Sequence, residues 1–208
     1  MNFVLPILIG WLVVDLATDW KLHKLLVLLT AVCWLVMDNF WMVKARGAKS
    51  VVVTHIPFWR KVWLVLRSYG FYYLPLSAVP VLGLKIIPEQ IAWLGLAMCV
   101  VGISFAIWSR HTLAGNWNVS ATGLGENQAL IQSGPYAIVR HPIYSGMLLA
   151  TLGTALTVGE LRAFFNLAAM MSEGWTKLNQ EEAILQKQFP GKYPDYQHRV
   201  KKLIPGIL

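Results

Sequence analysis

The stretch QIAWLGLAMCVVGISFAIWS, residues 90–109, contains no charged side chain. About 20 apolar residues in a helix are needed to cross roughly 30 Å of membrane hydrocarbon. Residues 25–43 form a similar run with Asp38 near one end, and residues 68–84 form an uncharged run that two prolines interrupt. Residues 143–159 are uncharged and slightly short. These runs predict membrane-spanning helices.

Two weaker apolar runs complete the pattern. Residues 2–14 end at Asp15, and residues 163–172 end at Glu173. We expect both to be membrane helices with polar ends, and the second to form a helical hairpin with residues 143–159 through Gly159-Glu160. The expected fold class is therefore all-α, a multi-pass transmembrane helix bundle of six spans, or of five if one weak run does not cross.

The composition agrees with a membrane protein. The chain has 208 residues, of which 56% are hydrophobic and 13% charged, whereas about 25% are charged in soluble domains. We expect one integral membrane domain over residues 1–208, with N-terminal spans in residues 1–109 and the chemistry in residues 110–208. This length leaves no room for a separate soluble catalytic domain, so the chemistry must lie at helix ends and in loops.

The net charge of +8 follows the apolar runs. Basic residues concentrate in residues 44–67 and after residue 176, which is the pattern that membrane orientation produces and not a nucleic-acid-binding stripe. Cytoplasmic loops of membrane proteins are rich in lysine and arginine. This rule places the 44–67 connection in the cytoplasm, and successive crossings then place the 110–142 loop and the C-terminal tail there as well. Cys33 and Cys99 lie in apolar runs without metal-ligand spacing, so we expect no metal.

The first cluster of candidate functional residues is SGPYAIVRHPIYSG, residues 133–146. Pro142 suits the first turn of a helix. Arg140 and His141 precede that turn, where free N–H groups and the helix dipole favour negative charge. The arrangement suits an anionic group such as a carboxylate or phosphate. The alternative is that Arg140 marks membrane topology and His141 caps the helix.

The second cluster is KLNQEEAIL, residues 177–185. Lys177 and Glu181 are four residues apart on one helical face. Glu181 and Glu182 could hydrogen-bond hydroxyl or amino groups, attract a cation or accept a proton; the alternative is a solvated helix face. Because the two clusters lie at the two ends of one predicted hairpin, on the same side, they can converge on one ligand that carries an anionic group, hydroxyls and a positive centre.

Together the clusters resemble the isoprenylcysteine carboxyl methyltransferase family and its phospholipid methyltransferase relatives. The resemblance covers about residues 110–205. It implies a membrane helix bundle that binds S-adenosylmethionine on the cytoplasmic side, below an opening to lipid. The matching residues are Leu130, Gly134, Tyr136, Arg140, His141, Pro142, Tyr144, Gly146, Glu181, Glu182, Leu185, Phe189, Tyr193 and Tyr196.

The same resemblance implies roles for individual residues. Arg140, Glu181 and Glu182 are expected to be catalytic. Lys177 stands where the family has a substrate-side arginine, and a lysine keeps the charge but loses the planar two-pronged grip on a carboxylate. The acceptor is therefore left open. Cofactor contacts are expected at Gln128, Ala129, Leu130, Ile131, Tyr136, His141, Pro142, Ile143, Tyr144 and Glu181.

The function expected from this resemblance is methyl transfer from S-adenosylmethionine to a lipid-like acceptor, such as an isoprenoid, a prenylcysteine-like molecule or a phospholipid. The cofactor carries the reactive group, so the protein has mainly a positioning task. One alternative is an NADPH-dependent membrane sterol or enone reductase, for which the 110–142 loop has few cations to hold the 2′-phosphate. The other is a non-enzymatic membrane scaffold.

Overall fold

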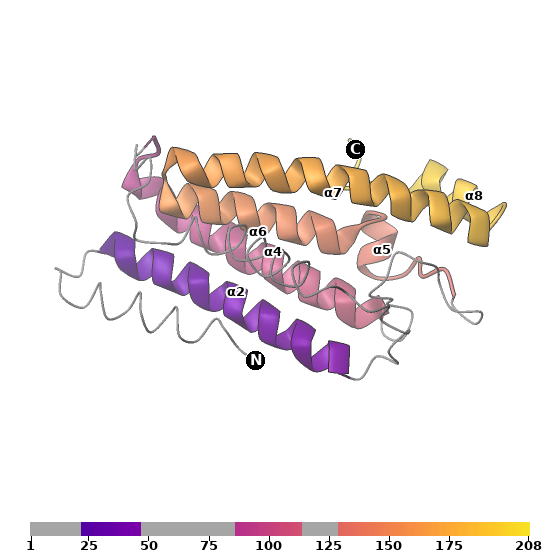
Figure 1. The fold of residues 1–208 in the computed structure, drawn as a ribbon, viewed down its shortest axis with the longest axis horizontal. Coiled ribbons are helices and arrows are strands. Elements are labelled where there is room, and N and C mark those ends of the chain that lie inside the picture. Colours follow the sequence, from indigo (N-terminus) through magenta and orange to yellow (C-terminus); the bar gives the residue numbers. More distant parts are fainter. Residues whose placement is uncertain (1–21, 47–85, 114–128) are drawn as a thin grey trace, which may run out of the picture.

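The computed structural model describes residues 22–46, 86–113 and 129–208, and every regular element within these ranges is helical. This confirms the all-α prediction for the described part of the chain. Four long helices lie side by side as a bundle, with two short helices near one end (Figure 1). The elements are α2 (Leu22–Arg46), the 3-10 turn η2 (Glu89–Ile91), α4 (Ala92–Leu113), α5 (Pro135–Ile138), α6 (Pro142–Val158), α7 (Leu161–Gln188) and α8 (Lys192–Arg199).

Small residues bring the backbones of α4 and α6 into direct contact, which is the most extensive contact between any two described helices. A Cβ added at Gly102 would lie 2.5 Å from the carbonyl oxygen of Gly146 and 2.5 Å from the nitrogen of Ala150. A Cβ at Gly95 would lie 2.6 Å from the carbonyl oxygen of Gly153. Helices in membranes commonly approach each other through such small residues. This pair forms the rigid centre of the bundle.

Helix α2 packs against this pair and closes the core. The Trp34 indole is 2% exposed, and its Nε1 donates a hydrogen bond to Thr154 Oγ1 at 2.9 Å. A buried indole N–H needs such a partner. Cys99 is also buried there, and its Sγ accepts from Thr154 Oγ1 at 3.8 Å. The core thus joins three helices around the uncharged part of α6.

The predicted hairpin is present. Helix α6 ends at Val158, and Gly159 adopts a left-handed conformation with φ of 72°. That conformation favours glycine at a helix C-terminus. Its carbonyl accepts hydrogen bonds from the backbone nitrogens of Ile86 at 2.9 Å and Ile87 at 3.2 Å, so the hairpin turn is tied to the segment that leads into α4. The structure therefore confirms the turn at Gly159-Glu160.

Helix α7 differs from the expected short span. The run of residues 163–172 and the acidic cluster that follows it form one uninterrupted helix, and Glu173 is exposed within it without ending it. A helix of 28 residues is about 42 Å long, whereas the 17 residues of α6 span about 26 Å. The polar half of α7 therefore projects beyond the start of α6, where α8 folds against it (Figure 1).

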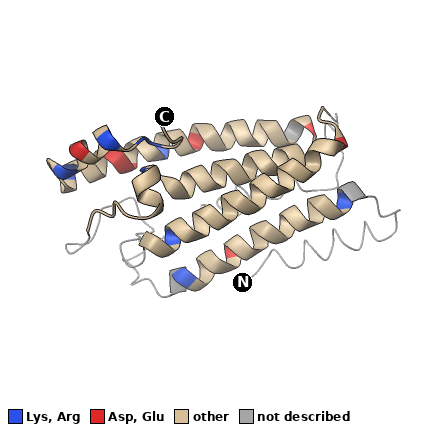
Figure 2. Cartoon of the chain, turned by 180° about the vertical axis from the view of Figure 1, so that it is seen from behind, with Lys and Arg blue, Asp and Glu red and all other residues tan. Residues whose placement is uncertain are grey.

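Two described helices, Lys24–Lys44 and Glu89–Leu113, are long and apolar enough to cross a membrane, and Pro142–Val158 is a shorter apolar helix. Charged residues are absent from the middle of α4 and from α6, and they gather toward helix ends and on the outer half of α7 (Figure 2). The predicted runs 2–14 and 68–84 lie outside the described residues. The expected count of six spans therefore stays a prediction.

Candidate active site

The turn between α5 and α6 is held by the C-terminal tail. Val139 and Lys201 form an isolated parallel β-bridge. The backbone nitrogen of Arg140 donates to the carbonyl of Lys201 at 2.8 Å, and that of His141 donates to the carbonyl of Lys202 at 3.0 Å. Two backbone N–H groups immediately before this helix are therefore satisfied by a segment about 60 residues away in the sequence.

Each nitrogen of the Arg140 guanidinium contacts a protein group. Its Nε donates to Glu182 Oε1 at 2.9 Å, and its Nη2 lies 2.8 Å from the same oxygen. Its Nη1 donates to the backbone carbonyls of Gln197, at 3.2 Å, and Val200. The side chain is 10% exposed. This geometry joins the α6 entrance, α7 and α8, and it leaves few of the five guanidinium hydrogens for an external anion.

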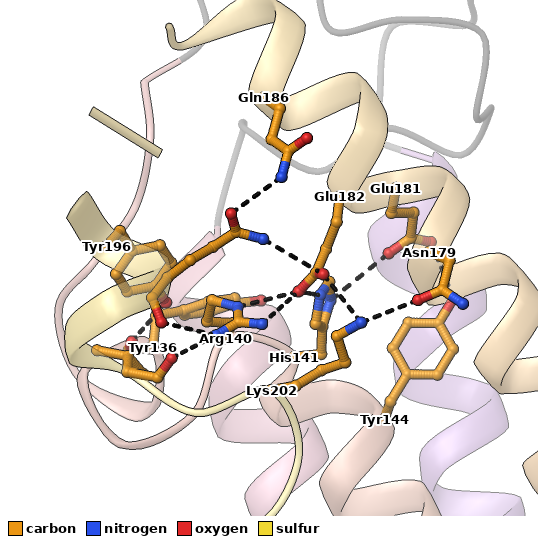
Figure 3. Close-up of polar contacts among 12 residues, drawn as sticks. Tyr136, Arg140, His141, Tyr144, Asn179, Glu181, Glu182, Gln186, Tyr196 and Lys202 are labelled. Carbon is orange, nitrogen blue, oxygen red and sulfur yellow. Dashed lines mark hydrogen bonds and ion pairs between the residues drawn. The ribbon is translucent and has the colours of Figure 1, made fainter. Parts of the chain in front are cut away.

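Glu182 lies at the centre of a polar cluster that it forms with Arg140, His141, Tyr144, Glu181 and Lys202 (Figure 3). Besides Arg140, its carboxylate contacts His141 Nε2 at 3.1 Å and Lys202 Nζ at 2.9 Å. Burial works to raise the pKa of Glu182, but the hydrogen bonds from His141, Lys202 and Arg140 outweigh it and lower this pKa to about 2. Glu182 is therefore ionised throughout the physiological range.

The contact with Glu182 also fixes where His141 carries its hydrogen. An ionised carboxylate only accepts hydrogen bonds, so the imidazole must donate from Nε2. In the neutral ring the other nitrogen, Nδ1, is then an acceptor. It lies 3.8 Å from Glu181 Oε2. A neutral His141 thus presents Nδ1 as an acceptor on the side of the second carboxylate.

Glu181 has a different environment from its neighbour. Tyr144 Oη donates to Glu181 Oε1 at 2.9 Å, and the Glu181 side chain is 32% exposed, against 10% for Glu182. The rings of His141 and Tyr144 meet edge to face with centroids 6.2 Å apart. The predicted meeting of the α6 entrance with the acidic part of α7 is therefore present, with Tyr144 and Glu181 in direct contact (Figure 3).

Three buried tyrosines support the α5 side of the site. Tyr196 Oη donates to the backbone carbonyl of Tyr136 at 2.6 Å, and the rings of Tyr193 and Tyr196 meet edge to face. Burial raises the pKa of all three phenols, so they stay neutral. The three tyrosines of the predicted pattern therefore support the site by packing, and they do not exchange protons in it.

The remaining predicted residues surround this cluster or lie at its edge. Pro142 is buried and Ile143 half-buried in the first turn of α6, and Leu130 and Ile131 are half-buried before α5, where Ala129 is exposed. Lys177 is exposed one turn before Glu181 on α7. Gln128 lies outside the described residues.

Lys202 is the main site residue that the sequence reasoning missed. Its Nζ contacts Glu182 Oε2 and Asn179 Oδ1, both at 2.9 Å, and lies 4.9 Å from the centre of the Trp175 ring. The charge pattern of the sequence indicates only that the tail cations mark membrane orientation. In the structure Lys201 is exposed and Lys202 is half-buried, because the tail runs beside Val139 at the start of α6. Without that path of the tail, the sequence does not indicate which of the two lysines points inward.

The Glu181 carboxylate gives this site a group that suits an organic cation. In residues 22–46, 86–113 and 129–208 no group of three His, Cys, Asp or Glu side chains could hold a metal. Glu181 offers one carboxylate that is fixed by a tyrosine hydroxyl and accessible from outside. A carboxylate of this kind complements a sulfonium or ammonium centre, or accepts hydrogen bonds from hydroxyl groups. The residues therefore fit the groups that S-adenosylmethionine carries.

Comparisons with known proteins also indicate a methyltransferase family. Residues 91–192 match the family model described as phospholipid methyltransferase. The protein-S-isoprenylcysteine O-methyltransferase of Schizosaccharomyces pombe is 29% identical over 91 residues, which is 43% of this chain and 39% of that relative. The family-model match includes both clusters.

A solved structure shares the fold. The eukaryotic intramembrane Ras methyltransferase ICMT (isoprenylcysteine carboxyl methyltransferase) superposes with a TM-score of 0.53 and 22% identity, over 75% of this chain and 55% of that one. The chain thus spans about two fifths of the first relative's length and just over half of the second. The first two comparisons confirm the family resemblance predicted from the two clusters, and the solved structure shows the same fold.

Proposed function

We propose that this chain, a member of the group formed by the isoprenylcysteine carboxyl methyltransferases and their phospholipid methyltransferase relatives, transfers a methyl group from S-adenosylmethionine to a lipid-like acceptor at the cytoplasmic face of the membrane. When bound, S-adenosylmethionine supplies an activated methyl group on a positively charged sulfur. The protein must then hold donor and acceptor in line, which is mainly a task of positioning and charge complementarity.

The observation that carries the proposal is the unequal pairing of the two adjacent glutamates. Glu182 is neutralised by Arg140 and Lys202 and accepts from His141. Among the described residues, Glu181 receives only the Tyr144 hydroxyl within hydrogen-bonding distance, and a third of its side chain is exposed. The negative charge of Glu181 is therefore the one available to a ligand, and a cationic methyl donor is such a ligand.

This geometry divides the roles of the predicted catalytic residues. Arg140 and Glu182 hold α6, α7 and α8 together, so we assign them a structural role in place of the anion-anchoring role expected for Arg140. Glu181 and Tyr144 would contact the donor, and Nδ1 of His141 lies beside them. A carboxylate acceptor would need no base. An amine or thiol acceptor would lose a proton, which His141 Nδ1 or Glu181 can take up.

The acceptor proposed is an amphiphile that enters from the bilayer. Large apolar side chains are exposed along α7, with Phe165 at 63%, Met171 at 53% and Trp175 at 43%. Trp175 lies within two turns of Glu181 on the same helix. A hydrophobic tail can therefore stay in lipid while the head reaches the polar cluster. The cytoplasmic side follows from the basic 44–67 connection.

The test is donor binding and methyl transfer by the detergent-purified full chain, with radiolabelled S-adenosylmethionine and a membrane lipid extract as acceptor. We expect labelled lipid from the wild-type protein. Glu181→Gln should weaken donor binding about 10- to 100-fold, since a hydrogen bond to a charged group contributes about 1.5–3 kcal/mol. Tyr144→Phe should weaken it less.

The control is Asp195→Asn, which removes an exposed carboxylate on α8 and should bind the donor like the wild type. Binding of NADPH in place of S-adenosylmethionine would favour the reductase alternative. Binding of neither would favour the scaffold. Equal donor affinity of Glu181→Gln and wild type would remove Glu181 from the donor site.

A further inference from the structure

The two oxygens of the Glu182 carboxylate are held by different segments of the chain. Oε1 receives Arg140 Nε and Nη2, at 2.9 and 2.8 Å, and His141 Nε2 at 3.1 Å. Oε2 receives Lys202 Nζ at 2.9 Å and Gln197 Nε2 at 3.4 Å. Lys202 is therefore the only close cation on the second oxygen among the described residues.

Both the side chain and the backbone of Lys202 make polar contacts that fix its position. Its ammonium also contacts Asn179 Oδ1 at 2.9 Å and lies over the Trp175 ring, and its side chain is 14% exposed. Its backbone carbonyl accepts from the nitrogen of His141 at 3.0 Å. The next carbonyl, that of Leu203, accepts from Ser145 Oγ at 2.6 Å. The tail thus presents this ammonium in one fixed position.

We propose that Lys202 is a positioning residue of the donor site: it fixes the Glu182 carboxylate, which in turn keeps the His141 hydrogen on Nε2 and leaves Glu181 free for the ligand. The donor-binding consequence rests on the proposed function above, whereas the effect on His141 does not. Lys202 acts through Glu182 and is not itself a catalytic residue.

The physical reason is the freedom of a carboxylate group. The terminal torsion of a glutamate is broad and roughly two-fold, so only contacts to both oxygens fix its plane. Without the ammonium, Glu182 can turn and share its oxygens between the two nitrogens of Arg140. His141 then loses its acceptor at Nε2, and the neighbouring carboxylate, with Glu181 Oε2 3.8 Å from Nδ1, becomes the competing acceptor. A hydrogen on Nδ1 would be donated to Glu181, and this carboxylate would then be less available to a ligand.

The test is ¹⁵N-histidine NMR of the full chain in detergent, without donor. The His141 signals are identified by their loss in His141→Gln. In the wild type we expect a protonated Nε2 and a bare Nδ1. Lys202→Met, which keeps the aliphatic stem, should show protonation of Nδ1, and Lys202→Arg should restore the wild-type pattern because it keeps the charge. Lys192→Met, an exposed lysine at the start of α8, is the control and should match the wild type.

An unchanged His141 pattern in folded Lys202→Met would overturn the inference. If Lys202→Met does not fold, Lys202→Gln replaces it, because the amide keeps hydrogen-bond donors while removing the charge, and the same two signals decide. Binding of labelled S-adenosylmethionine adds a second readout, with affinity expected to fall about ten-fold in Lys202→Met. A wild type that binds no donor contradicts the proposed function alone, since the NMR result is independent of it.

Discussion

At the scale of single residues, the site separates a carboxylate that holds the protein together from one that is left for a ligand. Glu182 has partners from the turn before α6, from α8 and from the tail, all within 3.4 Å. Breaking a buried ion pair on one side usually costs more than the pair contributes, because the remaining charge stays buried. Changes at Glu182 should therefore alter folding as well as any activity.

This predicts a specific pH dependence of stability. The pKa of Glu182 is about 2 in the folded protein and 4.5 for an ordinary glutamate. A group with a lowered pKa stabilises the fold fully above its unfolded value, and the contribution is lost as pH falls from about 4.5 toward 2. We expect Glu182→Gln to be roughly 3 kcal/mol less stable than wild type at neutral pH.

The measurement is thermal unfolding in detergent as a function of pH. The difference between wild type and Glu182→Gln should shrink steadily below about pH 4.5, while other carboxylates that titrate there affect both proteins alike. A constant difference down to pH 2 would show that Glu182 is not stabilised by its cationic partners. Asp195→Asn again provides a control, with no expected effect on this difference.

At the scale of elements, the contact between α4 and α6 leaves no room for side chains where their glycines meet. A methyl group on Gly102 would overlap backbone atoms of Gly146 and Ala150, which cannot move without separating the helices. The site depends on this contact because α6 begins at the Arg140-His141 turn. Gly174 on α7 is different, since a Cβ there would meet only Tyr144 Cδ1, at 3.9 Å, among the atoms of the described residues.

We therefore predict opposite outcomes for two glycine-to-alanine changes in helices. Gly102→Ala should destabilise the protein by roughly 1–3 kcal/mol, the usual cost of overpacking. Gly174→Ala should be neutral or stabilise by up to about 1 kcal/mol, because alanine favours helix more than glycine does. Thermal unfolding of both variants in the same detergent is the measurement. Equal stability of the two would contradict the close packing of α4 on α6.

The sequence allowed the helices and the hairpin to be predicted because those features are local. The lengths of the apolar runs located α2, α4 and α6, and Gly159 marked the turn that brings Arg140 next to Glu182. The continuation of α7 past Glu173 was not foreseen, because a charged residue ends an apolar run without ending a helix.

The contacts of the tail could not be predicted in the same way. The sequence predicts that Arg140 anchors an anion. Two of its partners in the structure are the backbone carbonyls of Gln197 and Val200, which have no signature in a sequence. Lys202 was missed for a related reason, since its meeting with Glu182 depends on how the tail crosses the α6 entrance. Such tertiary contacts follow from the fold and not from any periodicity.

At the scale of the whole molecule, the described polar site lies at one end of the bundle. Helix α4 ends at Leu113 near α5, and its other end begins beside η2 and the Gly159 turn. Charged side chains are dense on the outer half of α7 and on α8, beyond the start of α6 (Figure 2). If α4 crosses the bilayer, residues at its two ends lie on opposite sides of the membrane, and the site end is expected to be cytoplasmic.

Single cysteines at the two ends test this orientation. Ser133 is exposed just before α5, and Ile86 is 49% exposed at the opposite end of α4. In a background with Cys33 and Cys99 replaced by alanine, an impermeant maleimide added to intact cells should label Ile86→Cys and leave Ser133→Cys unlabelled until the membrane is opened. The reverse pattern would place the polar site outside, where it could not meet the intracellular donor. Labelling of both from outside would mean that α4 does not cross the membrane, and the bilayer route proposed for the acceptor would then lose its basis.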